Sequence, residues 1–189
     1  MKKILLAMVM FLPLAIFAQE DAKKQMTKFE EFTSKTGVIV KFIDTEMPNL
    51  SLSLSYGAST GIRKLTTAIR IIKGDSDAYF FRLEKAASSS SLSQIAMIEY
   101  SDLVEINKAL IKLASEVDND VASNPDYLEN KFKTVDGFEV GYYVSNGKAH
   151  WFLKLERYSR NTVFVKNQED LIEAFKNAQS KIEAFKITN

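Results

Sequence analysis

The sequence predicts an α+β fold, with a mostly antiparallel, twisted sheet of about seven to nine strands and two long helices on one face. Short segments of alternating or continuous apolar character are typical of strands. Two longer segments carry apolar residues at helical spacing. The order strand, strand, strand, helix occurs twice along the chain, which predicts that each half contributes strands and one covering helix.

Strand-like segments begin close to the N-terminus. Residues 29–33 and 38–43 flank the turn Ser34–Gly37 and are predicted to form a hairpin. Residues 50–55 alternate strictly between leucine and serine, the pattern of a strand with one buried face. Residues 57–61 form a loop of small residues before the next strand.

A repeat follows at a spacing of 72 residues. Residues 66–85 align without a gap with residues 138–157, and the alignment resumes at a spacing of 68 after a shorter second loop. We therefore predict an internal duplication with units of about 66–122 and 127–187. Because aligned identities are few, the alternative is that two hairpin-and-helix units resemble each other without a common origin.

The turns fix which strand faces are buried. Asn146–Gly147 is a preferred pair for a two-residue type I′ turn, and this turn places Tyr142 opposite Trp151 on an apolar face. We therefore expect Trp151 in the core. In the first unit an odd-length loop around residues 74–76 is predicted, because a one-residue slip would exchange the two faces. That loop aligns the residue pairs Ile69 with Phe81 and Ile71 with Tyr79.

Each unit closes with a short apolar strand, at residues 94–98 and 162–165, and then a helix. Ser101 or Asp102 is predicted to cap the first helix, and Asn124–Pro125 to end it. The helices should pack on the sheet through apolar stripes. These stripes are Leu103, Ile106, Leu110, Leu113 and Val117 in the first helix, and Leu171, Phe175, Ala178, Ile182 and Phe185 in the second.

The first 18 residues have the parts of a secretory signal peptide. Lys2 and Lys3 precede an apolar run from residue 4 to residue 17, and Ala18 is a small residue suited to cleavage. An uncleaved membrane anchor is the alternative, but a spanning helix needs about 20 apolar residues. The sequence therefore predicts export to the periplasm or the exterior, a flexible tail at residues 19–28, and one domain at residues 29–189.

Composition excludes several classes of chemistry. The chain has no cysteine, which excludes disulfides, thiolate metal sites and a cysteine nucleophile. Removing residues 1–18 removes two lysines and leaves 23 basic and 24 acidic residues, a net charge of −1. This balance argues against nucleic acid as a partner, and nothing after residue 18 resembles a membrane span.

No catalytic centre, metal site or cofactor site is predicted. His150 is the single histidine, and no G-x-S-x-G nucleophile motif accompanies it. The acidic cluster at residues 118–126 lacks the glycine of a calcium loop. The glycines at residues 57–61 lack the lysine and hydroxyl residue that follow directly in a phosphate-binding P-loop.

The repeat supplies the candidate binding residues. Its polar faces match, because each copy presents a phenylalanine, a cation and a glutamate in the same order. An aromatic ring and a cation on an open sheet face suit an extended or planar ligand. The alternative is that both phenylalanines are covered by N-terminal strands or by another protomer. The candidate ligand-binding residues are Phe80, Arg82, Tyr143, Phe152 and Lys154.

The sequence therefore favours a non-catalytic binding or accessory protein, whose ligand or protein partner and oligomeric state it does not identify. The alternative is a small exported hydrolase that uses carboxylates, which would need a deep pocket holding two carboxylates with perturbed pKa values. The layout resembles saddle-like or helix-grip architectures in general shape only. No stretch of the chain matches a family motif.

Overall fold

The computed structural model describes residues 26–53, 64–74, 76–87, 92–158 and 161–188. The predicted signal peptide and the small-residue loop at residues 57–61 lie outside the described residues. Of the predicted tail at residues 19–28, the description covers only the last three residues. Within the described part of the chain, no helix is long and apolar enough to span a membrane.

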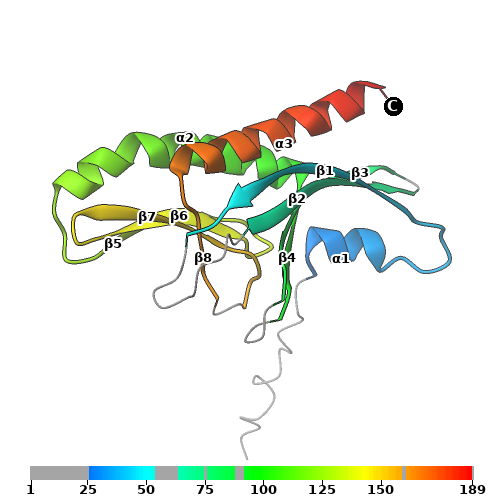
Figure 1. The fold of residues 1–189 in the computed structure, drawn as a ribbon. Coiled ribbons are helices and arrows are strands. Elements are labelled where there is room, and N and C mark those ends of the chain that lie inside the picture. Colours follow the sequence, from blue (N-terminus) through cyan, green and yellow to red (C-terminus); the bar gives the residue numbers. More distant parts are fainter. Residues whose placement is uncertain (1–25, 54–63, 75, 88–91, 159–160, 189) are drawn as a thin grey trace, which may run out of the picture.

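Two four-stranded antiparallel sheets form the body of the molecule, and a long helix follows each sheet in the chain (Figure 1). In both sheets the spatial order of the strands is their sequence order. The first sheet and its helix comprise β1 (Lys41–Ser51), β2 (Lys64–Lys73), β3 (Ala78–Lys85), β4 (Gln94–Glu99) and α2 (Tyr100–Ala122). The second sheet and its helix comprise β5 (Leu128–Lys133), β6 (Glu139–Ser145), β7 (Lys148–Lys154), β8 (Val163–Phe164) and α3 (Gln168–Thr188).

The α+β class and the antiparallel pairing are confirmed, but the prediction of a single sheet of seven to nine strands is wrong. The edge strands β1 and β8 meet only at an isolated bridge between Leu52 and Val165. Two backbone hydrogen bonds make this bridge, from Ser53 N to Phe164 O at 2.9 Å and from Lys166 N to Ser51 O at 3.2 Å, and β8 itself has only two residues. On its other side, the pairing of β1 with β2 is irregular between Met47 and Leu50, where Pro48 has no N–H to donate.

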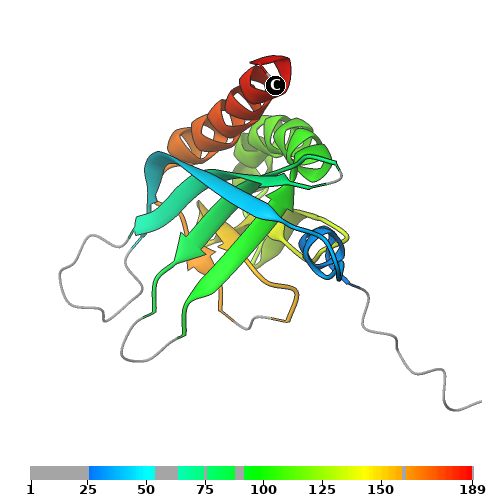
Figure 2. The same cartoon turned by 90° about the vertical axis from the view of Figure 1, so that its right-hand side faces the viewer.

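The helices α2 and α3 lie against each other and cover one side of the two sheets (Figures 1 and 2). Each helix reaches across to the other unit, because α2 contacts β5, β6 and β7 while α3 contacts β1, β2 and β3. The predicted helical stripes form the core between the layers. Every predicted stripe residue is buried except Phe185, which is partly buried.

The predicted strand registers are confirmed. Asn146 and Gly147 have positive φ angles of 53° and 67°, as a type I′ turn requires, and Tyr142 lies opposite Trp151. In the first sheet the odd-length loop aligns the residue pairs Ile69 with Phe81 and Ile71 with Tyr79. Trp151 is 6% exposed and its ring centroid lies 5.0 Å from that of Tyr142.

The predicted hairpin at residues 29–33 and 38–43 is wrong. Residues Lys28–Thr33 form helix α1, and the following strand β1 begins at Lys41 and pairs with β2. A capping box starts the helix: Glu30 N donates to Thr27 Oγ1 at 3.2 Å, and Thr27 N donates to Glu30 Oε2 at 2.7 Å. Two orphan amides are thereby satisfied, which favours the helical turn over extended chain.

The ends of α2 differ in part from the prediction. Glu99 is the N-cap, and its carboxylate accepts a hydrogen bond from Ser101 N at 2.8 Å, so Ser101 and Asp102 lie inside the first turn. The helix ends at Ala122, before Asn124–Pro125 as predicted, and Asn124 has a positive φ of 48°.

Candidate functional site

The outer face of each sheet, defined as the side away from α2 and α3, carries the five candidate ligand-binding residues. Phe80 and Arg82 lie on β3 of the first sheet, while Tyr143, Phe152 and Lys154 lie on β6 and β7 of the second. The structure thus divides the predicted set between two surfaces. It brings Tyr143, Phe152 and Lys154 together in one cavity.

On the first sheet, Phe80 is covered by helix α1. Phe80 is 0% exposed, and the rings of Phe29 and Phe32 meet it edge-to-face at centroid distances of 5.6 Å and 5.9 Å. Helix α1 lies on the opposite side of the sheet from α2 and α3 (Figure 1). Beside this cluster, the Arg82 guanidinium donates to Glu84 Oε2 at 2.5 Å. The Phe80 ring is therefore closed to a ligand while α1 is in place.

Polar contacts hold α1 to both units. Lys28 Nζ lies 2.7 Å from Asp102 Oδ1 and donates to Ser101 Oγ at 2.9 Å, at the start of α2. The Lys28 backbone N–H donates to Asp136 Oδ2 at 3.0 Å, in the turn before β6. Burial lowers the pKa of Lys28, but the hydrogen bond and charge of Asp102 outweigh it, so the pKa is raised.

On the second sheet, the matching surface contains a groove with a volume of about 270 Å³. All of its described lining side chains belong to β5–β8 or to neighbouring loop residues, and none to a helix. We call this surface the second-sheet groove. It is lined by Tyr127, Glu129, Tyr143, Phe152, Lys154, Thr162 and Phe164.

Aromatic rings form one wall of the second-sheet groove. The Tyr143 ring stacks on Tyr127 at a centroid distance of 6.1 Å and on His150 at 4.9 Å, and Phe164 meets it edge-to-face at 6.0 Å. Phe152 forms a buried floor at 3% exposure, whereas Tyr127 is 63% exposed. A ligand in the groove would therefore meet ring surface that is already ordered by stacking.

Lysines surround a buried carboxylate beside the groove, and one of them, Lys154, also lines the groove. The Glu139 side chain is 8% exposed and lies 3.1 Å from both Lys131 and Lys133 and 3.4 Å from Lys154. Burial raises the pKa of Glu139, but the hydrogen bonds from Lys131 and Lys133 outweigh it and lower the pKa below its usual range. With Glu129, which lies 2.6 Å from Lys131, the cluster has three cations and two anions.

Gly141 allows β5 to curl over β6 beside this cluster. A Cβ at position 141 would lie 2.2 Å from the carbonyl oxygen of Asn130 and 2.6 Å from Lys131 Cα. These contacts are with backbone, which cannot move aside as a side chain would. Glycine is therefore required at position 141, where β5 packs closely on β6 and places Glu129 at the groove.

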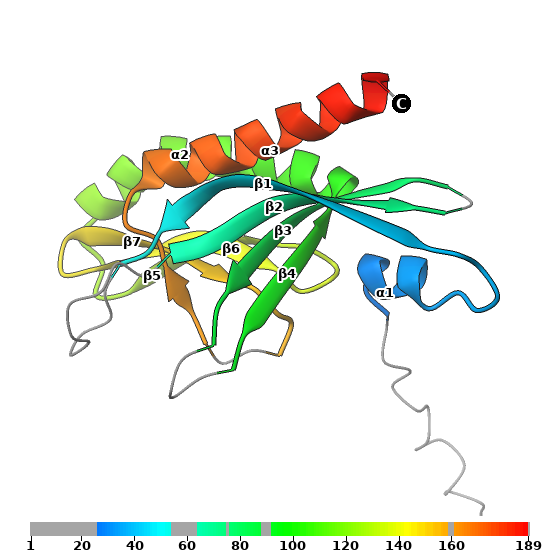
Figure 3. The ribbon, with the colours of Figure 1, turned by 45° about the vertical axis from the view of Figure 1, so that its right-hand side comes forward.

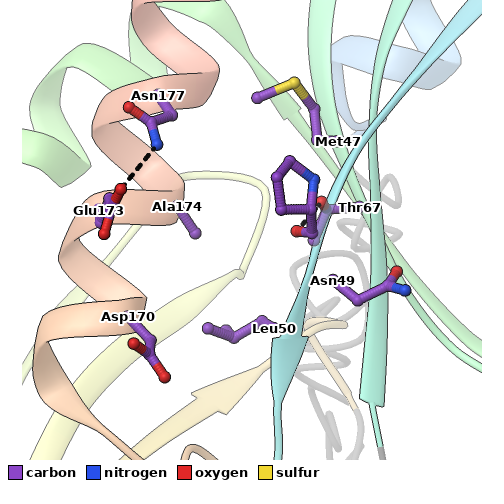
Figure 4. Close-up of a pocket in the computed structure, with 9 residues that line it drawn as sticks. Met47, Asn49, Leu50, Thr67, Asp170, Glu173, Ala174 and Asn177 are labelled. Carbon is purple, nitrogen blue, oxygen red and sulfur yellow. Dashed lines mark hydrogen bonds between the residues drawn. The ribbon is translucent and has the colours of Figure 1, made fainter.

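A smaller hollow of about 180 Å³ lies between β1 and α3 (Figure 4). Its polar side chains bond within the protein: Asn177 Nδ2 donates to Glu173 Oε1 at 3.4 Å, and Thr67 Oγ1 donates to the Pro48 carbonyl at 2.9 Å. The hollow lies at the irregular part of β1 next to Asn49 and Leu50. We assign the hollow no ligand.

Two of the residues considered for metal binding or catalysis, Asp120 and His150, have partners within the protein. Asp120 accepts a hydrogen bond from Tyr142 Oη at 2.5 Å, and His150 stacks on Tyr143. Across the described ranges, His, Asp and Glu side chains form no group of three or more that could hold a metal ion. The glycines at residues 57–61 lie outside those ranges.

The sequence did not indicate Tyr127, Glu129, Thr162 or Phe164 as groove residues. Alternation along residues 128–133 is the one signal of β5, and it does not show that the strand curls toward β7. No family model matches the chain, and neither a curated protein nor a solved structure matches it.

Proposed function

We propose that this chain is an exported, non-catalytic binding protein of the periplasm or the exterior, and that the second-sheet groove holds its ligand. One observation carries the proposal: Tyr143, Phe152 and Lys154 line a single groove, whereas Phe80, at the matching position of the first sheet, is covered by α1. The ligand class that suits the groove is an anion with a planar or ring-shaped apolar part, because stacked rings and Lys154 line one cavity beside a cluster of three cations and two anions.

Export rests on the first 18 residues. Their charged start, short apolar run and small final residue support cleavage after Ala18, so that the mature chain begins at Gln19. N-terminal sequencing of protein from the cell envelope or the medium checks this expectation. Recovery of a chain that still begins at Met1 would contradict it.

We further propose that the two units arose by internal duplication. In support, α2 begins at Tyr100 and α3 at Gln168, which reproduces the sequence spacing of 68, and each follows a four-stranded sheet of the same order. Phe80 and Phe152 then occupy equivalent positions. Helix α1 is an addition to one unit, and the second-sheet groove is the corresponding surface without that addition.

The groove is tested with a planar aromatic sulfonate, 8-anilinonaphthalene-1-sulfonate, titrated by fluorescence. Lys154→Gln should weaken binding at least tenfold, because it removes a cation from the groove and leaves two lysines on Glu139. Lys148→Gln is the matched control, since Lys148 is an exposed lysine at the start of the same strand. Tyr143→Ala should also weaken binding through loss of the stacked wall.

Native mass spectrometry of protein purified from its own envelope then addresses the natural ligand. We expect an added mass on the wild type and on Lys148→Gln that is absent from Lys154→Gln. A bare chain, or an added mass that all variants retain equally, would count against the groove as the ligand site.

The alternative, a hydrolase that uses carboxylates, has one supporting observation elsewhere in the molecule. A second cavity brings Glu30, Asp136 and Glu156 together, and burial raises the pKa of Asp136. Each of these carboxylates, however, accepts a hydrogen bond from a backbone N–H, which gives each a structural role. Binding is therefore the function that the geometry supports better.

A further inference from the structure

The cavity with these three carboxylates lies between the two sheets and has a volume of about 580 Å³. We call it the inter-sheet cleft. Its lining residues come from α1 and β4 on one side and from the chain segments before β6 and after β7 on the other. Figures 2 and 3 show α1 next to β4 in the ribbon. The apolar lining residues of the cleft are Phe29, Ile95, Ala96, Met97, Phe138 and Leu155, of which Met97 also packs against the buried cluster around Phe80.

Strand β4 presents an unpaired edge to this cleft. Among the described strands, β4 pairs only with β3, and its residues Ile95–Met97 line the cleft. The Ile95 N–H points away from β3 and donates to Glu156 Oε1 at 3.3 Å. Because N–H directions alternate along a strand, the Met97 N–H and C=O also point into the cleft.

The edge of β4 lacks the features that normally protect a sheet edge. Residues 94–98 are all uncharged, and the Ile95 side chain is exposed. By contrast, the free edge strand of the second sheet, β5, carries Lys131 and Lys133. Lysines on an edge oppose pairing with another strand, so β4 is the edge that remains suited to it.

The charge around the inter-sheet cleft indicates which peptide would pair there. Glu30, Asp136 and Glu156 contribute three carboxylates, and Arg157 is the single cation among the described lining residues. This excess of acid over base favours a peptide with basic side chains, while the apolar surface favours apolar residues at alternate positions.

We propose that the β4 edge binds an extended basic peptide by strand addition, with the peptide backbone pairing at residues Ile95–Met97. Its apolar side chains occupy the inter-sheet cleft, and its cations lie beside the three carboxylates. The Glu156 carboxylate occupies the Ile95 N–H in the free protein and yields that donor to the peptide. This surface is separate from the second-sheet groove and does not depend on it.

The probe is a fluorescein-labelled, amidated seven-residue peptide of alternating lysine and valine, titrated by anisotropy. Met97→Pro removes the N–H that points into the cleft without removing a bond to β3, and proline is tolerated at such edge positions. We expect Met97→Pro to bind at least tenfold more weakly than wild type. Met97→Ala, which keeps the N–H, should bind within threefold of wild type.

Three further measurements complete the test. An alternating glutamate and valine peptide should not bind, and a fully N-methylated lysine peptide should bind at least tenfold more weakly to the wild-type protein. The N-methylated peptide decides the question if Met97→Pro fails to fold. Lys154→Gln should bind the lysine peptide as wild type does, which separates this surface from the second-sheet groove.

Equal affinity of wild type and a folded Met97→Pro would overturn strand addition. Equal affinity for the N-methylated peptide would do the same, because binding would not use the backbone. Equal affinity for the glutamate peptide would overturn the charge selectivity. Absence of any anisotropy change at millimolar protein would overturn the proposal as a whole.

Discussion

The outer faces of the two sheets bury equivalent phenylalanines in different ways. Phe80 is sealed by a separate element, because Phe29 and Phe32 of α1 pack edge-to-face on it. Phe152 is nearly as buried, at 3% exposure, but its described surroundings are strands and loops of its own unit. Similar burial therefore leaves one face closed by a helix and the other open as a groove.

This difference shows that burial of a single residue does not decide whether a surface is free for a ligand. The first face has two layers, a phenylalanine and a helix above it. The second has one layer, and the side chains around Phe152 themselves form the groove walls. The element that distinguishes the faces, α1, is six residues long and has no buried residue of its own.

The largest expected effect separates the two phenylalanines directly. Phe80→Ala should lower the free energy of unfolding by about 3–5 kcal/mol, the range for truncating a buried phenylalanine. Phe152→Ala should cost about 1–3 kcal/mol less, because each of the two aromatic pairs made by Phe80 adds about 0.5–1.5 kcal/mol. Urea denaturation measures both. Equal losses would show that α1 adds nothing to the burial of Phe80.

Loosening α1 should make the outer face of the first sheet resemble that of the second, over which the described residues place no helix. The double variant Phe29→Ala, Phe32→Ala loses both edge-to-face pairs with Phe80, and we expect a loss of about 1–3 kcal/mol. Hydrogen exchange should show faster exchange in α1 while the sheets stay protected. Val38→Ala, an exposed position in the following loop, is the control and should change neither quantity. Unchanged exchange in α1 would mean that its polar contacts suffice to hold it.

A smaller effect is expected on the inner side of the second sheet. There α2 covers Tyr142, as α1 covers Phe80 on the outer side of the first sheet. The Tyr142 hydroxyl donates to Asp120 on α2, and burial, followed by that hydrogen bond, raises the pKa of Tyr142 to about 12. Tyr142→Phe should cost about 1 kcal/mol at pH 7, the typical net value of one hydrogen bond.

The stabilisation by the Tyr142 hydroxyl should depend on pH in the alkaline range, because the pKa of Tyr142 is raised in the folded protein. The native state holds the Tyr142 proton more tightly than the unfolded chain, whose tyrosine titrates near 10.0. The stabilisation is therefore complete below pH 10 and is lost as the pH rises toward 12. Thermal melts of both proteins should converge over that range. A constant difference between them would show that Tyr142 ionises equally in both states.

Much of the fold follows from local signals in the sequence. The helical stripes depend on a period of 3.6 residues, and the hairpin register depends on Asn146–Gly147, so both could be predicted without knowledge of distant contacts. The division into two sheets could not, because it depends on a single bridge between Leu52 and Val165. Helix α1 had a signal in the sequence, the capping box formed by Thr27 and Glu30. Phenylalanine, present at positions 29 and 32, is also common in strands, so the same segment fitted a strand.

The candidate site was predictable to a similar degree. Tyr143, Phe152 and Lys154 follow from strand alternation, which places them on one face. Tyr127 reaches the groove from the residue before β5, and Phe164 reaches it from β8, so their positions depend on how β5 and β8 pack beside β6 and β7. Such packing is a tertiary property that no short sequence window contains.

The hydrogen bond between the Lys28 N–H and Asp136 has a consequence for the order of folding. The two residues are 108 positions apart, so α1 cannot complete its docking until most of the chain has been synthesised. Until then α1 is held over the outer face around Phe80 by contacts within the first unit alone, those of Phe29, Phe32 and Lys28. The covering of Phe80 is therefore weakest after the first unit emerges and before the second unit has added its hydrogen bond, and self-association of the nascent chain through this apolar face is most favoured in that interval.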